Sequence, residues 1–265
     1  MTQEDSSDRM RFYDHLDELR VRLMRCLAVF FIGFVVCYFF ADGFLAILRK
    51  PLFDVMPPDQ RKLYFTSLFE NFLTHLKIAG YASLFVFSPY FFYQLWAFIS
   101  PGLYPKERKL AAPFLVAATS FFVGGACFAY FVLFPVGFKF FVTYGAPTDA
   151  PMLTISAYYG TCLKLLLLFG LAFELPVLIC LLGYLGIVDA EMLRRNRRNA
   201  ILGISVASAL FAPPDAISML ILGAPLIFLY EGSIWVVQGL GLKRRAQAFA
   251  RDQQPENPLE GRSRE

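Results

Sequence analysis

Two long stretches without a charged residue constrain this chain more than any other feature of its sequence. Between Lys77 and Lys106 lie 28 uncharged residues, and between Lys109 and Lys139 lie 29. About 20 apolar residues in an α-helix are enough to cross the ~30 Å hydrocarbon core of a bilayer. Only 17% of the chain is charged, where a typical soluble domain has about 25%. The sequence therefore predicts an all-α, polytopic membrane protein.

The apolar runs predict a membrane domain over residues 24–240 with six transmembrane helices. A cytoplasmic N-terminal segment at 1–23 and a disordered cytoplasmic tail at 241–265 flank it. The last two runs are short because Pro213-Pro214-Asp215 divides them, so this hairpin should thin the bilayer or stop short of crossing it. The expected spans cover about 24–45, 79–100, 113–138, 158–185, 199–213 and 216–237.

The distribution of lysine and arginine predicts the orientation. Six spans put both termini on one side, and that side carries 18 of the 25 basic residues, while the other face carries six and Lys164 lies within a span. Positively charged loops stay in the cytoplasm. Both termini are therefore predicted to be cytoplasmic. The first 25 residues are polar and no small-residue cleavage pattern follows the apolar run, so no cleavable signal peptide is expected.

Prolines inside the predicted spans indicate bent helices. Each of them lacks the N–H group that a helix interior needs, and its ring clashes with the preceding turn. Bent helices around a short hairpin favour a curved, concave wall over a straight bundle. The sequence shows no internal repeat, which argues against an inverted-repeat transporter. The prolines concerned are Pro89, Pro135, Pro176 and Pro225.

Neither a metal site nor an enzymatic centre is indicated. The five cysteines all fall in apolar stretches without a CxxC pair, so they are expected to be small buried side chains. Two histidines are too few for most metal sites, and the spans contain no HExxH, GxSxG or paired aspartates. We therefore expect a protein that is not an enzyme and that needs no metal or other cofactor.

Two glutamates on the predicted cytoplasmic face are candidates for binding a cation. Glu18 shares a helical face with His15 and Arg22, so it either forms a stabilising i,i+4 pair with Arg22 or meets a cation arriving from the cytosol. Glu107 follows the turn-forming prolines of the 98–110 loop. By itself it is either a solvated loop charge or a second part of the same site.

Glu174 lies within the predicted fourth span, about 18 Å from its cytoplasmic end. A carboxylate at that depth costs several kcal/mol unless it meets water or a partner, so Glu174 either locks helices together or has a function. One alternative function is a proton-coupled secondary transporter, in which Glu174 carries the proton and Lys164 or Glu231 assists. Glu231 is more simply interfacial, and Lys164 can snorkel to the opposite interface.

Five motifs occur in one order across residues 12–240. They are HLDELRVRL, YQLWAFISPGLYPKERK, FAYFVLFPVGFKFF, FGLAFELPVLICLL and LFAPPDAIS. Together they resemble TatC, the polytopic subunit of the twin-arginine protein translocase. The resemblance implies six helices arranged as a concave, glove-like wall in the cytoplasmic (inner) membrane of a bacterium.

The same resemblance implies a function and partners. The chain would be a receptor for signal peptides that carry two adjacent arginines. It would assemble with TatB-like and TatA-like single-span proteins and with other copies of itself, and would move folded proteins across the membrane using the proton-motive force. The lipid bilayer is its expected surroundings, and no nucleic acid is expected as a partner.

Individual residues also acquire roles from the resemblance. Glu18 and Glu107 would bind the two arginines, because guanidinium makes bidentate bonds to carboxylate that lysine copies poorly. Glu174 would contact polar groups of partner helices. Asp17 is acidic where many relatives carry an apolar residue, so it could share the arginine contact. Arg20, Phe98, Pro101 and Tyr104 would support the site, and Pro51 and Asp215 would be structural or partner-linked positions on the far side.

Overall fold

The computed structural model describes the backbone of residues 3–100, 111–143, 152–211 and 216–252. It describes side chains for residues 15–58, 60–100, 111–143, 152–210 and 219–239. Every regular element in the described ranges is helical, and the only β contact there is an isolated bridge between Tyr64 and Thr154. The prediction of an all-α protein is confirmed.

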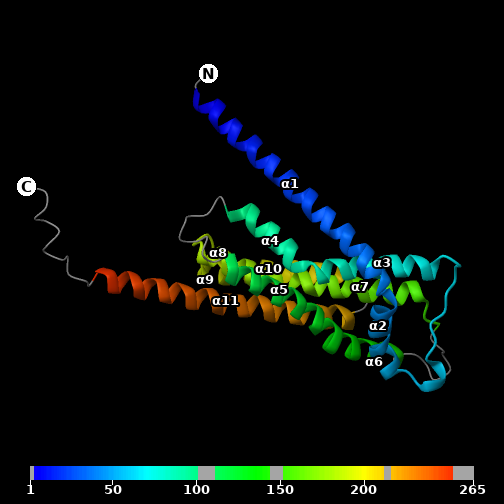
Figure 1. Cartoon of the computed structure of the whole chain (residues 1–265). Helices are drawn as coiled ribbons and strands as arrows, with labels where there is room; N and C mark the ends of the chain where they lie inside the picture. The colour runs from blue at the N-terminus through cyan, green and yellow to red at the C-terminus, as the bar shows by residue number, and fades with distance from the viewer. Residues whose placement is uncertain (1–2, 101–110, 144–151, 212–215, 253–265) are drawn as a thin grey trace, which may run out of the picture. The chain divides into compact units, whose positions relative to one another are not determined.

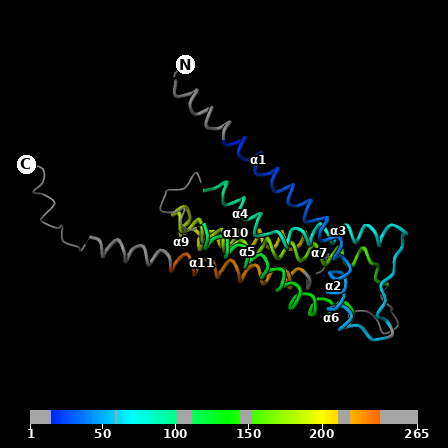
Figure 2. Tube along the Cα trace, in the orientation of Figure 1, coloured from blue at the N-terminus to red at the C-terminus, as the bar shows by residue number. Residues whose placement is uncertain are grey.

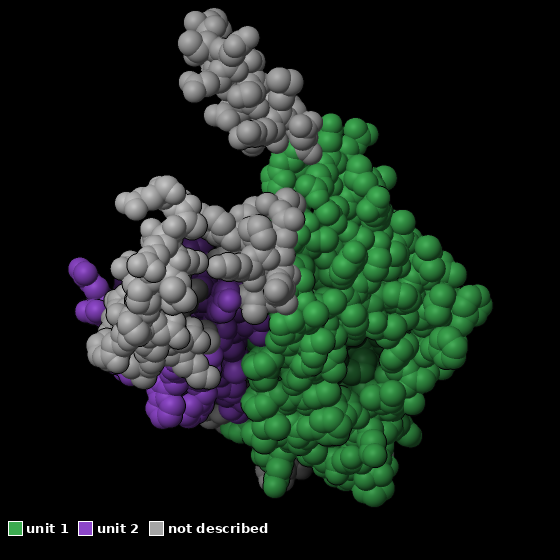
Figure 3. Space-filling model, turned by 60° about the vertical axis from the view of Figure 1, so that its left-hand side comes forward, with its two compact units in different colours: residues 1–174 green, residues 175–265 purple. Residues whose placement is uncertain are grey.

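The chain forms two compact units, residues 1–174 and 175–265, which Figure 3 shows in different colours. In the first unit α1 packs on α3, α3 on α7, and α5 on α7, as can be followed in Figures 1 and 2. Its helices are α1 (Gln3–Phe39), α2 (Ala41–Val55), η1 (Pro58–Gln60), α3 (Glu70–Val86), α4 (Ser88–Ile99), α5 (Ala111–Phe128), the π-helical turn η4 (Ala129–Leu133), α6 (Phe134–Thr143) and α7 (Ile155–Ala172).

Within the described part of the chain, four helical stretches are long and apolar enough to cross a membrane. They are His15–Phe39, Ala111–Thr143, Ile155–Tyr184 and Met219–Gly239. The pair α3 and α4 is a fifth candidate, bent by 56° at its break. Helix α10 (Arg197–Phe211) has 15 residues and so is only about 22 Å long, less than the hydrocarbon core. A polytopic chain is thus supported, while six spans and cytoplasmic termini remain predictions.

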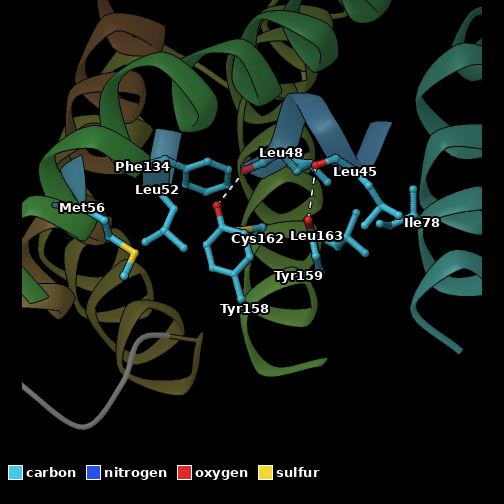
Figure 4. Close-up of a cluster of buried hydrophobic side chains, with 10 residues drawn as sticks. All are labelled: Leu45, Leu48, Leu52, Met56, Ile78, Phe134, Tyr158, Tyr159, Cys162 and Leu163. Atoms are coloured by element: carbon cyan, nitrogen blue, oxygen red, sulfur yellow. Dashed lines mark hydrogen bonds between the residues drawn. The ribbon is translucent and has the colours of Figure 1, made fainter. Parts of the chain in front are cut away.

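The first apolar helix ends at Phe39, and the backbone turns at Phe40 before α2 begins. The last residues of the predicted 24–45 run therefore belong to α2. This helix buries one face, which contains Leu45, Leu48 and Pro51. That face enters the main cluster of buried side chains, together with residues of α3, α6 and α7 (Figure 4).

Proline and tyrosine residues act together in this cluster. Pro51 has no N–H group, so the carbonyl of Ile47 one turn earlier loses its helical donor. The hydroxyl of Tyr130 donates to that carbonyl at 2.9 Å. Two further hydroxyls donate to α2 carbonyls: Tyr158 to Leu48 at 2.7 Å, and Tyr159 to Leu45 at 3.3 Å (Figure 4). The structure thus gives Pro51 a packing role, because the carbonyl that it releases anchors a neighbouring helix.

Three of the four prolines in the predicted spans coincide with a change in the helix. Pro89 follows the break at Phe87, and the hydroxyl of Ser88 donates to the released carbonyl of Phe85 at 2.8 Å. Pro135 follows the π-helical turn η4. Pro176 follows the junction at Phe173, where α7 gives way to α8. Helix α11 (Ala216–Asp252) continues through its own proline, Pro225.

A buried glutamate fastens the start of α7 to the start of α3. The Glu70 carboxylate accepts hydrogen bonds from the Thr66 N–H at 2.6 Å, the Thr66 hydroxyl at 2.9 Å and the Ser156 N–H at 2.7 Å. Beside it, backbone bonds join Tyr64 to Leu153 and to Ile155. These contacts fix the register of α3 relative to α7.

The second unit contains most of α8 (Glu174–Tyr184), followed by α9 (Ala190–Arg195), α10 and α11. Its polar contacts join the basic segment around α9 to the last helix. Arg197 pairs with Glu231 at 2.7 Å, and Arg194 donates to Gln238 at 2.6 Å. The ion pair lies at a partly exposed position, which supports an interfacial location for Glu231.

Replacing Glu70 tests the fastening of α3 to α7. Glu70→Ala removes the buried carboxylate that accepts from the N–H groups of Thr66 and Ser156, so we expect it to lower the free energy of unfolding by about 1–3 kcal/mol. The measurement is denaturant unfolding of the full chain in detergent. The exposed Asp54 provides the control, since Asp54→Ala should change stability by less than about 0.5 kcal/mol. Equal effects of the two substitutions would contradict the structural role.

Candidate functional site

The contact between α1 and α4 carries the polar residues that the sequence singled out. Arg22 donates through Nε and Nη2 to Oε1 of Glu18, at 2.9 and 2.6 Å. Its third group, Nη1, reaches across to Oε1 of Gln94 on α4 at 3.2 Å. Arg22 therefore links the Glu18 carboxylate to the neighbouring helix, and the i,i+4 pair that the sequence allowed is formed.

Gln94 is the buried member of this network. Its side chain is 5% exposed, and its Nε2 group donates to the Tyr90 hydroxyl one turn earlier at 2.7 Å. A buried amide costs free energy unless its groups are hydrogen-bonded. With Arg22 as donor and Tyr90 as acceptor, Gln94 is satisfied and holds Arg22 in place. Sequence reasoning missed this residue, although a glutamine in the uncharged run after Lys77 was a signal for it.

Phe98 is brought to the same site by an aromatic contact. Its ring stacks on His15 with a centroid distance of 4.4 Å and an angle of 12° between the ring planes. Nδ1 of His15 lies 3.8 Å from Oε2 of Glu18, too far for a hydrogen bond. Oε2 is thus left open, and the Glu18 side chain is 33% exposed. The structure joins Phe98 and Glu18 through His15.

The other predicted cytoplasmic residues are only partly described. Arg20 and Asp17 are exposed on α1. Pro101, Tyr104 and Glu107 lie outside the described residues, so whether Glu107 approaches Glu18 remains a prediction. Asp215 also lies outside the described part of the chain.

Glu174 occupies the first position of α8, directly after the break at Phe173. It is 7% exposed, and its Oε1 has no hydrogen-bond partner among the described atoms. Two more buried polar atoms share this condition in unit 1, Trp96 Nε1 on α4 and Thr119 Oγ1 on α5. Because buried polar groups are nearly always paired, these three are candidates for contact with a group from outside the chain.

Close packing of α5 on α7 brings Thr119 toward the end of α7 that Glu174 follows. Gly125 lies against the backbone of Phe169, and Gly170 lies against the ring of Phe122. The two helices therefore run antiparallel at short distance, with Thr119 one turn beyond Phe122 on the side of Glu174. Any larger side chain at either glycine would meet a neighbouring helix.

Comparison with known proteins gives one family. The family model of the Sec-independent protein translocase protein (TatC) matches residues 14–225. The chain is 39% identical over 233 residues to the Sec-independent protein translocase protein TatC of Desulforapulum autotrophicum, covering 88% of this chain and 86% of that protein. It is 39% identical over 226 residues to the protein of the same name from Campylobacter jejuni, covering 84% and 92%.

Solved structures show the same similarity. A crystal structure of the twin arginine translocase receptor TatC matches with a TM-score of 0.75 and 32% sequence identity, over 84% of this chain and 98% of that one. A second crystal structure of such a receptor, in DDM, matches with a TM-score of 0.77 and 33% identity over the same shares of the two chains.

Removing the Arg22 side chain tests the junction of α1 with α4. Arg22→Ala deprives Glu18 and the buried Gln94 of their donor, so we expect the free energy of unfolding to fall by about 1–3 kcal/mol. The exposed Arg20 on the same helix offers a matched control, and Arg20→Ala should cost less than about 0.5 kcal/mol. A double-mutant cycle with Gln94→Leu measures the coupling directly. A coupling energy of zero would mean that the Arg22–Gln94 contact contributes nothing.

Proposed function

This chain belongs to the TatC family of Sec-independent protein translocase proteins, and we propose that it is the receptor subunit for twin-arginine signal peptides. As a member of that family it is a component of the twin-arginine protein translocase, a non-catalytic subunit in protein transport. We place it in the inner membrane of a bacterium, where it takes part in the export of folded proteins driven by the proton-motive force.

The hydrogen bonding of the Glu18 carboxylate, in which described residues occupy only one of its two oxygens, supports this proposal most directly. One oxygen, Oε1, already holds the guanidinium group of Arg22, so the surroundings of Glu18 suit that cation. The other oxygen, Oε2, has no hydrogen bond among the described residues, and the side chain is one-third exposed. An arginine arriving from the cytosol would bind Oε2 while Arg22 holds the carboxylate in its orientation through Oε1.

A second carboxylate would explain the need for two arginines. We assign this role to Glu107, with Pro101 and Tyr104 shaping the loop and Phe98 forming an apolar wall beside His15. Guanidinium is planar and presents its donors as a rigid fork, whereas the lysine ammonium is a compact point charge, so a twin-lysine sequence would bind weakly. Basic neighbours such as Arg20 would repel cations that do not match this geometry.

The orientation belongs to the same proposal. Both termini, the loop that contains Glu107 and the basic segment around α9 carry most of the lysines and arginines, which favours a cytoplasmic location. Six crossings are needed for this arrangement, with α10 and the first part of α11 forming the final hairpin. The signal-peptide site would then face the compartment in which folded precursors are made.

We further propose that Glu174 contacts single-span partners of the TatB-like and TatA-like kind. Its unpaired Oε1 and the unpaired groups of Trp96 and Thr119 lie in apolar surroundings. A polar side chain from a partner helix would satisfy them, and hydrogen bonds between membrane helices add roughly 0.5–2 kcal/mol each. The transporter hypothesis for Glu174 is not favoured, because the chain belongs to a translocase family and Glu231 is already paired with Arg197.

Removing both site carboxylates tests the receptor proposal. The double variant Glu18→Gln, Glu107→Gln keeps side-chain size but loses charge. Each lost charged hydrogen bond is worth about 1.5–3 kcal/mol, so binding of a twin-arginine signal peptide should fall more than tenfold. The measurement is peptide pull-down with the full chain in detergent, with a twin-lysine peptide in parallel.

The control for this experiment is Glu191→Gln, which removes an exposed acidic charge on α9. It should leave binding unchanged. If the double variant bound the twin-arginine peptide as well as the wild type, or if both peptides were recovered equally, the assignment of Glu18 and Glu107 would be wrong.

Replacing the intramembrane acid tests the partner contact. Glu174→Leu removes an unpaired buried carboxyl group and should leave the chain folded, since apolar replacements of such groups are well tolerated. It should reduce copurification of a TatB-like partner several-fold, while Glu174→Gln should retain part of it. Ser233→Ala, which removes a buried hydroxyl that already donates to the Leu229 carbonyl at 2.7 Å, should have no effect. Unchanged copurification with Glu174→Leu would refute this role.

A further inference from the structure

Two lysines on different helices share a pocket that the receptor function does not use. Lys77 of α3 and Lys164 of α7 both line a cavity of about 330 Å³. Hydroxyl-bearing residues complete its wall, among them Tyr81, Ser156 and Thr161. A pair of ammonium groups surrounded by hydroxyl donors is suited to an anion with several oxygen atoms, such as a phosphate group.

The register of α3 and α7 explains how the two lysines meet. Glu70 and Ser156 are hydrogen-bonded at the starts of these helices. Lys77 follows Glu70 by seven residues and Lys164 follows Ser156 by eight, so both lie about 10–12 Å along their helices from the same contact. The pocket therefore holds both lysines at a similar depth along the two helices.

These two charges are not neutralised within the described part of the chain. Neither ammonium group forms an ion pair or hydrogen bond there. Glu70, the acidic residue at the starts of the two helices, is buried and already accepts three hydrogen bonds. Two uncompensated cations on apolar helices favour an anionic ligand from outside.

Gly160 keeps the pocket open. It lies inside α7, where glycine is less favourable than alanine by about 1 kcal/mol, and a Cβ atom built on it would meet nothing within 4 Å. Tight helix packing therefore does not require this glycine. A side chain at position 160 would instead occupy the space between Lys77 and Lys164.

An apolar groove continues from the charged pocket. It has a volume of about 450 Å³ and is lined on every side by apolar or aromatic residues of α2, α3, α5, η4 and α7. Tyr81 and Leu163 line both cavities, so the two are adjoining. Ile78, Ala82 and Leu166 lie further along the groove. A charged pocket that leads into an apolar groove matches a molecule with an anionic head and a hydrocarbon chain.

We propose that this composite site binds one anionic phospholipid. Its phosphate lies between Lys77 and Lys164, and one acyl chain lies in the groove. A free phosphate would use only the charged pocket and leave the groove empty, whereas the lipid matches both parts. In the orientation proposed above, the site faces the leaflet away from the cytoplasm.

Lipid retention measured by native mass spectrometry tests this inference on the full chain in detergent. Wild-type protein should retain phosphatidylglycerol at least tenfold better than phosphatidylcholine, and inorganic phosphate should not displace it. Lys77→Gln, Lys164→Gln should lose this preference, whereas Lys77→Arg, Lys164→Arg should keep it. The double variant Lys50→Gln, Lys139→Gln removes two exposed charges outside the pocket and should behave as wild type.

Gly160→Leu fills the pocket without removing a charge. It therefore tests lipid binding independently of any effect that the lysine substitutions have on folding. A Cβ atom built at this position meets nothing within 4 Å, so we expect the variant to fold as the wild type does while losing phosphatidylglycerol. The proposal is overturned if Gly160→Leu or the Lys77, Lys164 glutamine variant retains phosphatidylglycerol like the wild type. It is also overturned if inorganic phosphate displaces the lipid, or if a photo-crosslinker at Thr161 captures a polypeptide instead of lipid in native membranes.

Discussion

Backbone carbonyls that lose their helical donor are the constraint on which this structure depends. Each such carbonyl needs another donor, which a neighbouring side chain can supply. Pro51 and Pro89 each release one carbonyl, and the hydroxyls of Tyr130 and Ser88 take up the bonds. The first of these bonds joins residues 83 positions apart. Proline, which weakens a helix in isolation, here frees one of the three α2 carbonyls that accept from neighbouring tyrosines.

The polar groups at the α1–α4 contact are also paired with one another. Arg22 serves as donor to Glu18 and Gln94 together, and Gln94 passes the network on to Tyr90. No buried group of this chain of contacts is left without a partner. What stays open is Oε2 of Glu18, on the exposed side of the network. Hydrogen bonds to the protein thus fix the Glu18 side chain, while Oε2 remains open to a ligand. A ligand that binds there loses less free energy to ordering of the site.

Much of the fold class could be predicted from sequence, whereas the contacts that make the site could not. Uncharged runs identify membrane helices because a helix that crosses the hydrocarbon core must be about 20 residues long and mostly apolar. The Glu18–Arg22 pair is local in sequence and was among the possibilities. The Arg22–Gln94 bond joins residues 72 positions apart. It could not be predicted, because it depends on how α4 turns after the break at Phe87. The sequence offers no prediction for Glu70, because its contact with Ser156 depends on the return of the chain 86 residues later.

The fastening of α3 to α7 has a mechanical consequence. From Glu70 to the break at Phe87 is 17 residues, and from Ile155 to the break at Phe173 is 18, so the two interruptions lie at similar depth, about 26 Å from the clamped ends. Bending is easiest where helical hydrogen bonds are already missing. Each helix is thus fixed at its start and interrupted at a similar distance from that fixed point. A force applied beyond the breaks would bend each helix at that common distance and leave its start, held through Glu70, in place.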